Sequence, residues 1–320
     1  MKSIRLGFTY WKFETRDLEI DDWGSLFEVD IFAEPRGMLI SDVITHVATI
    51  GYTAADGSRV APNPNYDFGD LLGCLDDDAD IDANYRPDTV RSIRQRMTTY
   101  ASLALFNGAG TALSDLLHPF QATVLMLARV PDALKKVIVA VLIRRILRER
   151  RDASMAQKRI DLDSRLDSEQ RIQLGELIRC KVPRTWVLMD EAHVLAGVGE
   201  PSVAREALVK YAKEGRNYGL SLALATQQPS ALDPRLMSQV ETAIVHQLTD
   251  PHDATVAKNA MRSPLPTSVS IDGESGEVTT LLRRLGQGVA TFSCGNAPGL
   301  QRLCVASIRP RISAHGGYEA

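Results

Sequence analysis

The sequence predicts an α/β protein built on a doubly wound, mostly parallel sheet with a small helical insertion. Two observations carry this prediction. From residue 122 onward, short apolar runs alternate with segments of helical periodicity, as in chains whose helices cover both faces of one sheet. The first of these runs, Ala122–Ala128, is almost wholly apolar rather than alternating with polar residues, which is typical of a strand buried on both faces of a parallel sheet.

The first third of the chain is predicted from turn and helix signals. Residues 25–35 follow a short strand pattern that ends at a proline. Residues 51–70 are rich in Gly, Pro, Asn and Asp, which is typical of a loop. Between 67 and 111 the pattern is helical, with one helix expected from Arg86 to about Phe106. The acidic run over 76–82 is expected to be a solvated loop, and a cation site there would be the exception.

The remaining elements follow the α/β alternation. The run Ala122–Ala128 is expected to be a buried strand, and Pro131 opens a helix whose apolar side chains recur at helical spacing. Further strands are expected at 186–189, 220–225, 242–246, 288–293 and 303–308, helices at 203–214, 234–240 and 253–261, and a tight hairpin at 270–277.

Length and composition are those of a globular protein. The 320 residues are 44% hydrophobic and 24% charged, which excludes collagen-like and wholly disordered chains. No apolar run approaches the roughly 20 residues that span a bilayer, and we expect no secretory signal. A membrane partner is therefore not expected, and the cytoplasm is the expected location. With a net charge of −3, any contact with nucleic acid requires local basic patches.

The cysteine pattern argues against a cross-linked scaffold. Cys74, Cys180, Cys294 and Cys304 are widely spaced and form no Cys-x-x-Cys pair. Neither a disulfide framework nor a structural zinc site is therefore expected from the sequence.

The segment Val187–His193 is the sharpest chemical signal, because an apolar strand is followed directly by Asp190 and Glu191. Ligands of open α/β folds bind at the carboxyl ends of the strands, where these acids are expected to lie. In phosphoryl transfer, an aspartate at this place holds Mg²⁺, directly or through water, and an adjacent glutamate orients and polarises the attacking water. The alternative is that the two acids end the strand without a metal.

A second strand pattern ends in polar side chains. The run from Leu222 is followed by Thr226 and Gln227, a hydroxyl and an amide that can sense a γ-phosphate or position a water. Between the two strands lies Arg216, which can reach phosphate charge within the chain or across a subunit boundary. Each feature alone fits a structural role, but their order and spacing together favour a nucleotide site.

These segments, together with Asp233–Val240, closely resemble the HerA branch of the HerA/FtsK superfamily, which comprises RecA-like, hexameric, DNA-pumping ATPases. The resemblance is strong over residues 119–315, includes the tail 309–317 and is weak before residue 119. It implies a RecA-like fold, ATP and Mg²⁺ as cofactors, double-stranded DNA as partner, and a homo-oligomeric, hexameric ring.

The resemblance also implies roles for individual residues. Asp190 corresponds to the Walker B acid that holds Mg²⁺, and Glu191 to the catalytic glutamate. Gln227 and its neighbour Thr226 match the sensor position. Arg216 matches an arginine that contacts nucleotide phosphates near the subunit interface.

The chain departs from the family pattern at the phosphate-binding loop. No GxxxxGK[ST] occurs in the 320 residues, and the glycine-rich segment 107–111 has no lysine. The segment Val29–Glu34 resembles the acidic end of the strand that follows the P-loop helix, so the chain is expected to begin just after or within the P-loop region. The expected domains are a residual part of the core over 1–66, a helical insertion over 67–118 and the ATPase core over 119–320.

Two functions follow. The first is an ATP-driven double-stranded DNA translocase or helicase that works with a nuclease or defence effector in DNA repair or phage defence. The second is a non-hydrolysing subunit that assembles with or regulates an active ring, or binds DNA. A DEAH-box helicase is disfavoured because no arginine-rich motif of a second lobe follows Asp190–His193. His193 is expected in a polar network, since no Cys or His lies near it at metal-ligand spacing.

A basic stretch between residues 135 and 159 has two interpretations. It is either the solvated face of an amphipathic helix or a stripe that binds DNA phosphates without sequence preference. Its members are Lys135, Lys136, Arg144, Arg145, Arg148, Arg150, Arg151, Lys158 and Arg159.

Overall fold

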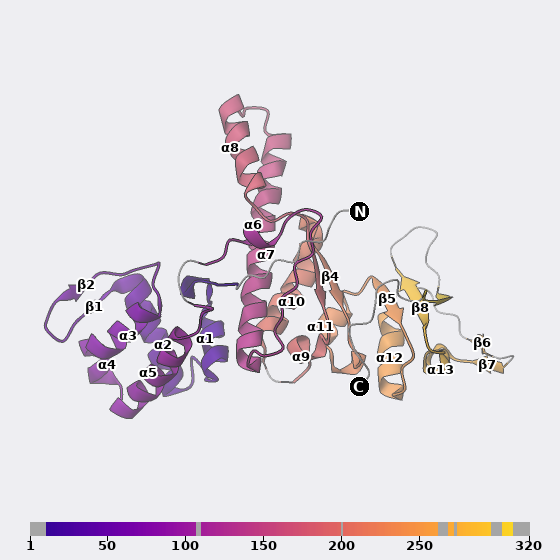
Figure 1. Ribbon diagram of the computed structural model, residues 1–320, viewed down its shortest axis with the longest axis horizontal. Coiled ribbons are helices and arrows are strands. Elements are labelled where there is room, and N and C mark those ends of the chain that lie inside the picture. Colours follow the sequence, from indigo (N-terminus) through magenta and orange to yellow (C-terminus); the bar gives the residue numbers. More distant parts are fainter. Residues whose placement is uncertain are drawn as a thin grey trace. The chain divides into compact units, whose positions relative to one another are not determined.

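A computed structural model shows a chain of two compact units (Figure 1). Unit one comprises residues up to 185 together with 202–207 and 214–220, and unit two comprises the remaining residues from 186 onward. The structure describes residues 11–106, 110–199, 201–261, 268–271, 274–295 and 303–309.

Unit one is mainly helical. Its α-helices are α1 (Ile20–Phe27), α2 (Pro35–Thr45), α3 (Phe68–Asp77), α4 (Ala79–Asn84), α5 (Pro87–Ala101), α6 (Leu113–Leu116), α7 (Asp132–Leu162) and α8 (Ser168–Arg179). Shorter elements are η1 (Thr15–Asp17), the π-helix η2 (His46–Ile50), η3 (Gly215–Tyr218) and the antiparallel strands β1 (Tyr52–Thr53) and β2 (Arg59–Val60).

Local sequence signals explain where these helices begin. Asp67 is the N-cap of α3, and its side chain accepts the backbone N–H groups of Gly69 and Asp70. Pro87 occupies the first turn of α5, where its missing N–H costs no helical hydrogen bond. The predicted helices from Arg86 and from Pro131 are confirmed as α5 and α7.

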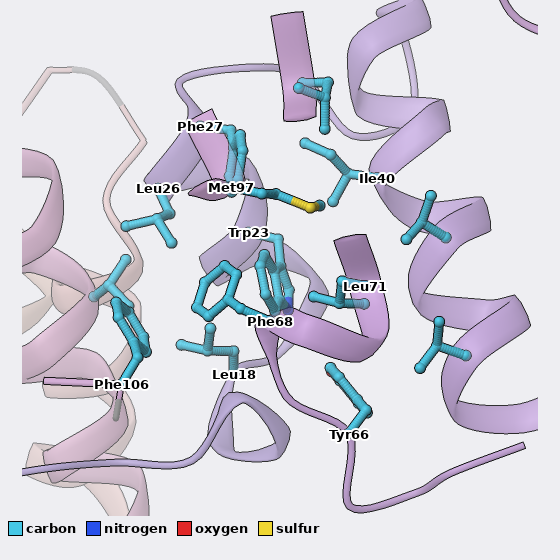
Figure 2. Close-up of a cluster of buried hydrophobic side chains, with 14 of the residues drawn as sticks. Leu18, Trp23, Leu26, Phe27, Ile40, Tyr66, Phe68, Leu71, Met97 and Phe106 are labelled. Atoms are coloured by element: carbon cyan, nitrogen blue, oxygen red, sulfur yellow. The ribbon is translucent and has the colours of Figure 1, made fainter. Parts of the chain in front are cut away.

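A cluster of buried aromatic and aliphatic side chains forms the core of unit one (Figure 2). The centroid of the Phe68 ring lies 5.5 Å from that of the Trp23 ring and 5.0 Å from that of the Phe106 ring. Both pairs have the edge-on arrangement that aromatic rings favour. Because Trp23 comes from α1 and Phe68 from α3, the core joins residues on both sides of the domain boundary expected at residue 66. That boundary, like the one at 118, stays a prediction.

The long helix α7 is tied to the start of unit one by a buried ion pair. Arg144 donates from Nη1 to Oδ1 of Asp22 at 3.1 Å, and its Nη2 pairs with Oδ2. Asp22 is fully buried, so burial raises its pKa while Arg144 opposes the shift. Arg145 lies 3.4 Å from Asp17. Part of the basic stretch is therefore occupied with acids of unit one itself.

The strand predicted over residues 25–35 is wrong. Helix α1 extends to Phe27 and α2 begins at Pro35. Between them, the Asp30 carboxylate accepts the backbone N–H groups of Phe32 and Ala33, both at 2.9 Å. These local bonds hold a turn in place of a ladder. The likeness of Val29–Glu34 to a strand end is corrected accordingly.

The strand predicted over Ala122–Ala128 is also wrong. Residues 121–127 have no strand pairing, and Val124 and Met126 are 81% and 78% exposed. A strand needs a neighbour to satisfy its backbone groups, and none lies beside this segment among the described residues. The acidic run is not a loop either, because it falls within α3 and α4 and buries Asp78.

Unit two contains a parallel pair of strands and an antiparallel sheet. The parallel pair is β3 (Trp186–Met189) and β4 (Ser221–Leu224), and the antiparallel sheet has the order β5 (Thr242–Val245), β8 (Val289–Cys294), β9 (Cys304–Ser307). A third, antiparallel pair is β6 (Val269–Ile271) with β7 (Glu274–Gly276), as predicted for a hairpin. The helical elements are α9 (His193–Ala196), α10 (Val203–Glu214), η4 (Pro229–Ala231), α11 (Pro234–Met237), α12 (Pro251–Ala260) and α13 (Val278–Arg284), of which α10 is shared with unit one.

The antiparallel sheet has its own small core. Ala254 and Ala257 of α12 pack with Val278 and Leu282 of α13, and Val245 of β5 packs against this cluster. The small alanine side chains let α12 approach its neighbours closely.

The α/β class is confirmed, but the doubly wound, mostly parallel sheet is not. Among the described strands only β3 and β4 pair in parallel. Strand β3 was predicted from its apolar run, yet Trp186 and Leu188 are 69% and 75% exposed. Within the described residues, no helix is both long and apolar enough to cross a bilayer. Most of the tail 309–317 lies outside the described residues.

Phe68→Ala is expected to lower the free energy of unfolding by about 3–5 kcal/mol, because it leaves a cavity beside Trp23 and Phe106. The matched control is Phe32→Ala, whose ring is 72% exposed and whose loss is expected to cost less than about 0.5 kcal/mol. Equilibrium urea unfolding followed by tryptophan fluorescence measures both. Equal losses would show that the cluster in Figure 2 is not the core of unit one.

Candidate phosphoryl-transfer site

The parallel pairing of β3 with β4 brings two strand ends to one edge. Trp186 pairs with Ser221 and Met189 with Leu224, so the two strands run in register to their last residues. The pairing continues one step beyond them, since the N–H of Ala225 donates to the carbonyl of Met189 at 2.8 Å and the N–H of Ala192 to Ala225 at 2.9 Å. The polar residues after each strand therefore lie beside one another.

Glu191 has a left-handed backbone at this edge. Its φ of +48° is a conformation that costs an L-residue roughly 1–2 kcal/mol. Two contacts hold it there: its own N–H donates to Oδ1 of Asp190 at 3.0 Å, and the next residue, Ala192, is bound to Ala225. Backbone strain of this kind is kept where the surrounding structure fixes it, and such positions cluster at functional sites.

Both oxygens of the Glu191 carboxylate have neighbours from the site. The Gln227 side-chain amide donates to Oε1 at 2.8 Å. Oε2 lies 3.4 Å from Nδ1 of His193, which is itself 3.0 Å from the Thr226 hydroxyl oxygen. The carboxylate is therefore oriented by one amide and one imidazole, while its side chain remains 43% exposed. An oriented, accessible carboxylate can polarise a water molecule.

Thr226 also shapes the backbone after β4. Its hydroxyl oxygen accepts the N–H of Gln228 at 3.1 Å, the side-chain turn that Ser and Thr favour. One residue thus orients His193 and bends the chain that carries Gln227.

Two aspartates that sequence reasoning did not single out hold the following loop. Asp253 accepts the N–H of Ser230 at 2.8 Å. Asp233 is buried, its backbone N–H donates to Ala196 at 3.0 Å, and its side chain caps α11 through the N–H of Arg235 at 2.7 Å. The sequence does hold a signal for Asp233, because an aspartate followed by a proline is a pattern typical of helix starts.

Asp190, Glu191, Thr226 and Gln227, predicted as site residues, are thus at one edge of unit two. His193 lies in a polar network, as predicted. Asp190 is exposed, and one of its carboxylate oxygens accepts the backbone N–H of Glu191. The roles predicted for these residues stay predictions.

Arg216 lies in unit one, in the short helix η3. The element is fixed by its neighbours: Gly219 adopts a φ of +72°, and Arg150 Nε donates to the carbonyl of Tyr218 at 2.9 Å. A side chain at Gly219 would meet the Arg184 side chain at 3.1 Å, which adds a steric reason for glycine. The role predicted for Arg216 stays a prediction.

The fold is similar to that of a solved structure. The solved structure of VirB4 from Thermoanaerobacter pseudethanolicus matches 92% of this chain and 69% of that chain, with a TM-score of 0.50 and 15% identity. At that identity, the likeness concerns the fold. No family model matches the chain.

The sequence is similar to DNA helicases named HerA. Over 177 residues it is 26% identical to the DNA double-strand break repair helicase HerA of Pyrococcus furiosus, covering 52% of this chain and 31% of that relative. A stretch of 74 residues is 35% identical to the probable HerA of Methanocaldococcus jannaschii, covering 23% and 15% of the two chains. The resemblance to HerA-like proteins is confirmed. The matches span about a third or less of the relatives' own length.

The left-handed backbone at Glu191 predicts that glycine is more stabilising than alanine there, the reverse of their order in a helix. Glu191→Gly is expected to be more stable than Glu191→Ala by about 1 kcal/mol, because both remove the carboxylate but only glycine adopts this φ without strain. At Lys210, an exposed helical position in α10, the alanine variant is expected to be the more stable by about 1 kcal/mol. Urea unfolding of the four variants tests this, and the same order at both positions would contradict the backbone assignment.

Proposed function

We propose that this chain carries the water-activating part of the nucleotide site of a HerA-type, ATP-driven double-stranded DNA translocase with a RecA-like core. The observation that carries the proposal is the contact between Glu191 and Gln227 at the ends of two parallel, hydrogen-bonded strands. Similarity to HerA helicases supports the choice of chemistry.

Each residue has a distinct part in the proposed site. Asp190 offers Mg²⁺ an exposed carboxylate oxygen, the ligand type that this ion prefers. Glu191 orients and polarises the attacking water, and Gln227 keeps that carboxylate in place. Thr226 positions the sensor segment. Bound ATP supplies the phosphoryl group, and Arg216 contributes positive charge to its phosphates.

The residues present fit Mg²⁺ better than they fit the phosphates of ATP. A phosphate cradle needs free backbone N–H groups and a lysine, and the sequence has no GxxxxGK[ST]. In the glycine-rich segment 107–111, the described N–H groups are occupied: Gly110 donates to Glu14 and Thr111 to the carbonyl of Lys12. Gly110 and Thr111 therefore offer no free N–H to a phosphate.

That observation favours a second candidate function. A non-hydrolysing subunit that assembles with or regulates an active ATPase ring, or binds DNA, requires no phosphate cradle. This function is consistent with a sequence that has no P-loop motif. It does not explain why Glu191 has a strained backbone and a carboxylate that Gln227 orients.

DNA contact is proposed to come from the exposed part of the basic stretch. Lys158 and Arg159 are exposed on α7, whereas Arg144 is bound to Asp22 and the exposed Arg148 lies 3.8 Å from Asp17. Lysine and arginine on one helix bind phosphates without sequence preference. We propose that the chain forms a homo-oligomeric ring in the cytoplasm and works with a nuclease or defence effector. The probable HerA of Methanocaldococcus jannaschii is named for DNA double-strand break repair.

Glu191→Gln is expected to reduce DNA-stimulated ATP hydrolysis by the full-length protein at least about a hundredfold, because the amide no longer polarises water. Its affinity for ATP with Mg²⁺ is expected to stay within about threefold of wild type, since the amide keeps the size of the carboxylate. Phosphate release with and without duplex DNA measures the first quantity and calorimetry the second.

Lys210→Gln, on the exposed side of α10, is the control and is expected to hydrolyse ATP at the wild-type rate. A Glu191→Gln rate near wild type would refute the assignment of the carboxylate. Absence of hydrolysis by the wild-type protein would refute the translocase and favour the non-hydrolysing subunit.

A further inference from the structure

Unit one brings together three side chains that the phosphoryl-transfer site does not use. His46 follows α2 as the first residue of η2, Cys74 lies in α3, and Asp78 joins α3 to α4. One ligand atom from each, an imidazole nitrogen, a sulfur and a carboxylate oxygen, lies within 4.8 Å of the other two. These are three different metal-ligating groups on three elements.

The imidazole of His46 and the thiol of Cys74 both contact one oxygen of the Asp78 carboxylate. Asp78 Oδ2 lies 2.5 Å from Nδ1 of His46 and 3.5 Å from Sγ of Cys74. The other oxygen, Oδ1, accepts the N–H of Asp80 at 2.9 Å as the N-cap of α4. The cap fixes the carboxylate, so Oδ2 is held toward the sulfur and the imidazole. A hydrogen-bonded second oxygen of this kind orients a carboxylate ligand in metal sites.

The backbone around Asp78 is also fixed. Its N–H donates to the carbonyl of Cys74 at 3.0 Å, its carbonyl accepts the N–H of Asp82 at 3.1 Å, and it forms an isolated bridge with Ala54. The ligand pair Cys74 and Asp78, four residues apart, is therefore held at constant spacing.

The cluster is shielded from water. Cys74 is fully buried, Asp78 is 3% exposed, and the His46 side chain is 17% exposed. Among the described residues, His46 is the one ion-pair partner recorded for Asp78. A buried carboxylate beside a buried thiol is costly unless positive charge balances it.

A divalent cation meets this requirement, and the ligand set selects its type. Thiolate and imidazole exclude Ca²⁺ and Mg²⁺, which take oxygen ligands. Zn²⁺ binds sulfur, nitrogen and carboxylate oxygen in tetrahedral sites. The charges of one thiolate and one carboxylate neutralise it.

We propose that His46, Cys74 and Asp78 bind one Zn²⁺ ion, with water in the fourth tetrahedral position. The ion links the end of α2 to the junction of α3 and α4 and so stabilises unit one. It binds in place of the hydrogen bonds that now join the three groups, and the Cys74 thiol releases its proton to the solvent on binding. The expectation of no zinc site rested on the absence of a Cys-x-x-Cys pair, which this arrangement does not need.

A nucleophilic cysteine is a poorer interpretation of the same cluster. The Cys74 thiol donates to the Asp78 carboxylate, which is too weak a base to convert it to the nucleophilic thiolate. It is also fully buried and out of reach of a substrate.

The test uses Co²⁺ as a spectroscopic probe and the full chain. Chelator-treated protein titrated with Co²⁺ is expected to develop a near-ultraviolet thiolate-to-cobalt charge-transfer band that saturates at about one equivalent, and Zn²⁺ is expected to displace it. Cys74→Ser is expected to abolish the band. Cys180→Ser, at an exposed cysteine after α8, is the matched control and is expected to leave it unchanged.

A second variant covers the case in which Cys74→Ser does not fold. His46→Gln changes a partly exposed side chain and is expected to weaken Co²⁺ binding at least about tenfold. Addition of Zn²⁺ to chelator-treated protein is expected to raise the melting temperature of wild type but not of His46→Gln. The proposal is overturned if the wild-type protein shows no charge-transfer band, if Cys180→Ser rather than Cys74→Ser removes it, or if His46→Gln binds Co²⁺ as wild type does.

Discussion

The parallel hydrogen bonding of β3 to β4 is the constraint on which the candidate site depends. It places the residues after Met189 beside those after Leu224, and it continues through Ala225 and Ala192. Because this ladder passes on both sides of Glu191, the residue between is held in its left-handed conformation. The backbone strain at Glu191 and its contact with Gln227 thus both follow from the register in which β3 pairs with β4. A shift of that register by one residue would remove both.

Unit one depends on buried polar groups of a different kind. Asp22 and Arg144 link α1 to α7 in an environment where losing either partner would leave an unpaired buried charge. Around Asp78, the part of the chain that the structure describes places an imidazole and a thiol, but no arginine or lysine, beside the buried carboxylate, which is why we propose a bound cation there. Buried charge therefore decides both how the helices of this unit are joined and where it can hold a ligand.

The sequence predicts the two strands that carry the candidate site better than it predicts the sheet as a whole. Strands β3 and β4 were found because their apolar runs end in Asp190 and Thr226, a local signal. The strands expected at 25–35 and 122–128 fail because apolar pattern alone ignores the Asp30 turn bonds and the need for a neighbouring strand. The sequence placed Asp78 in an acidic run but gave no sign of its association with His46 and Cys74, since packing of separate helices brings these residues together.

The central claim is that Asp190 and Glu191 form a magnesium-dependent nucleotide site. Its most direct test is calorimetric titration of ATP into the full-length protein, with Mg²⁺ or with chelator, for wild type and for Asp190→Asn. We expect wild type to bind at least about tenfold more tightly with Mg²⁺, and Asp190→Asn to lose this difference while still binding ATP without the metal. The same Mg²⁺ dependence in both proteins, or no binding by wild type, would contradict the claim.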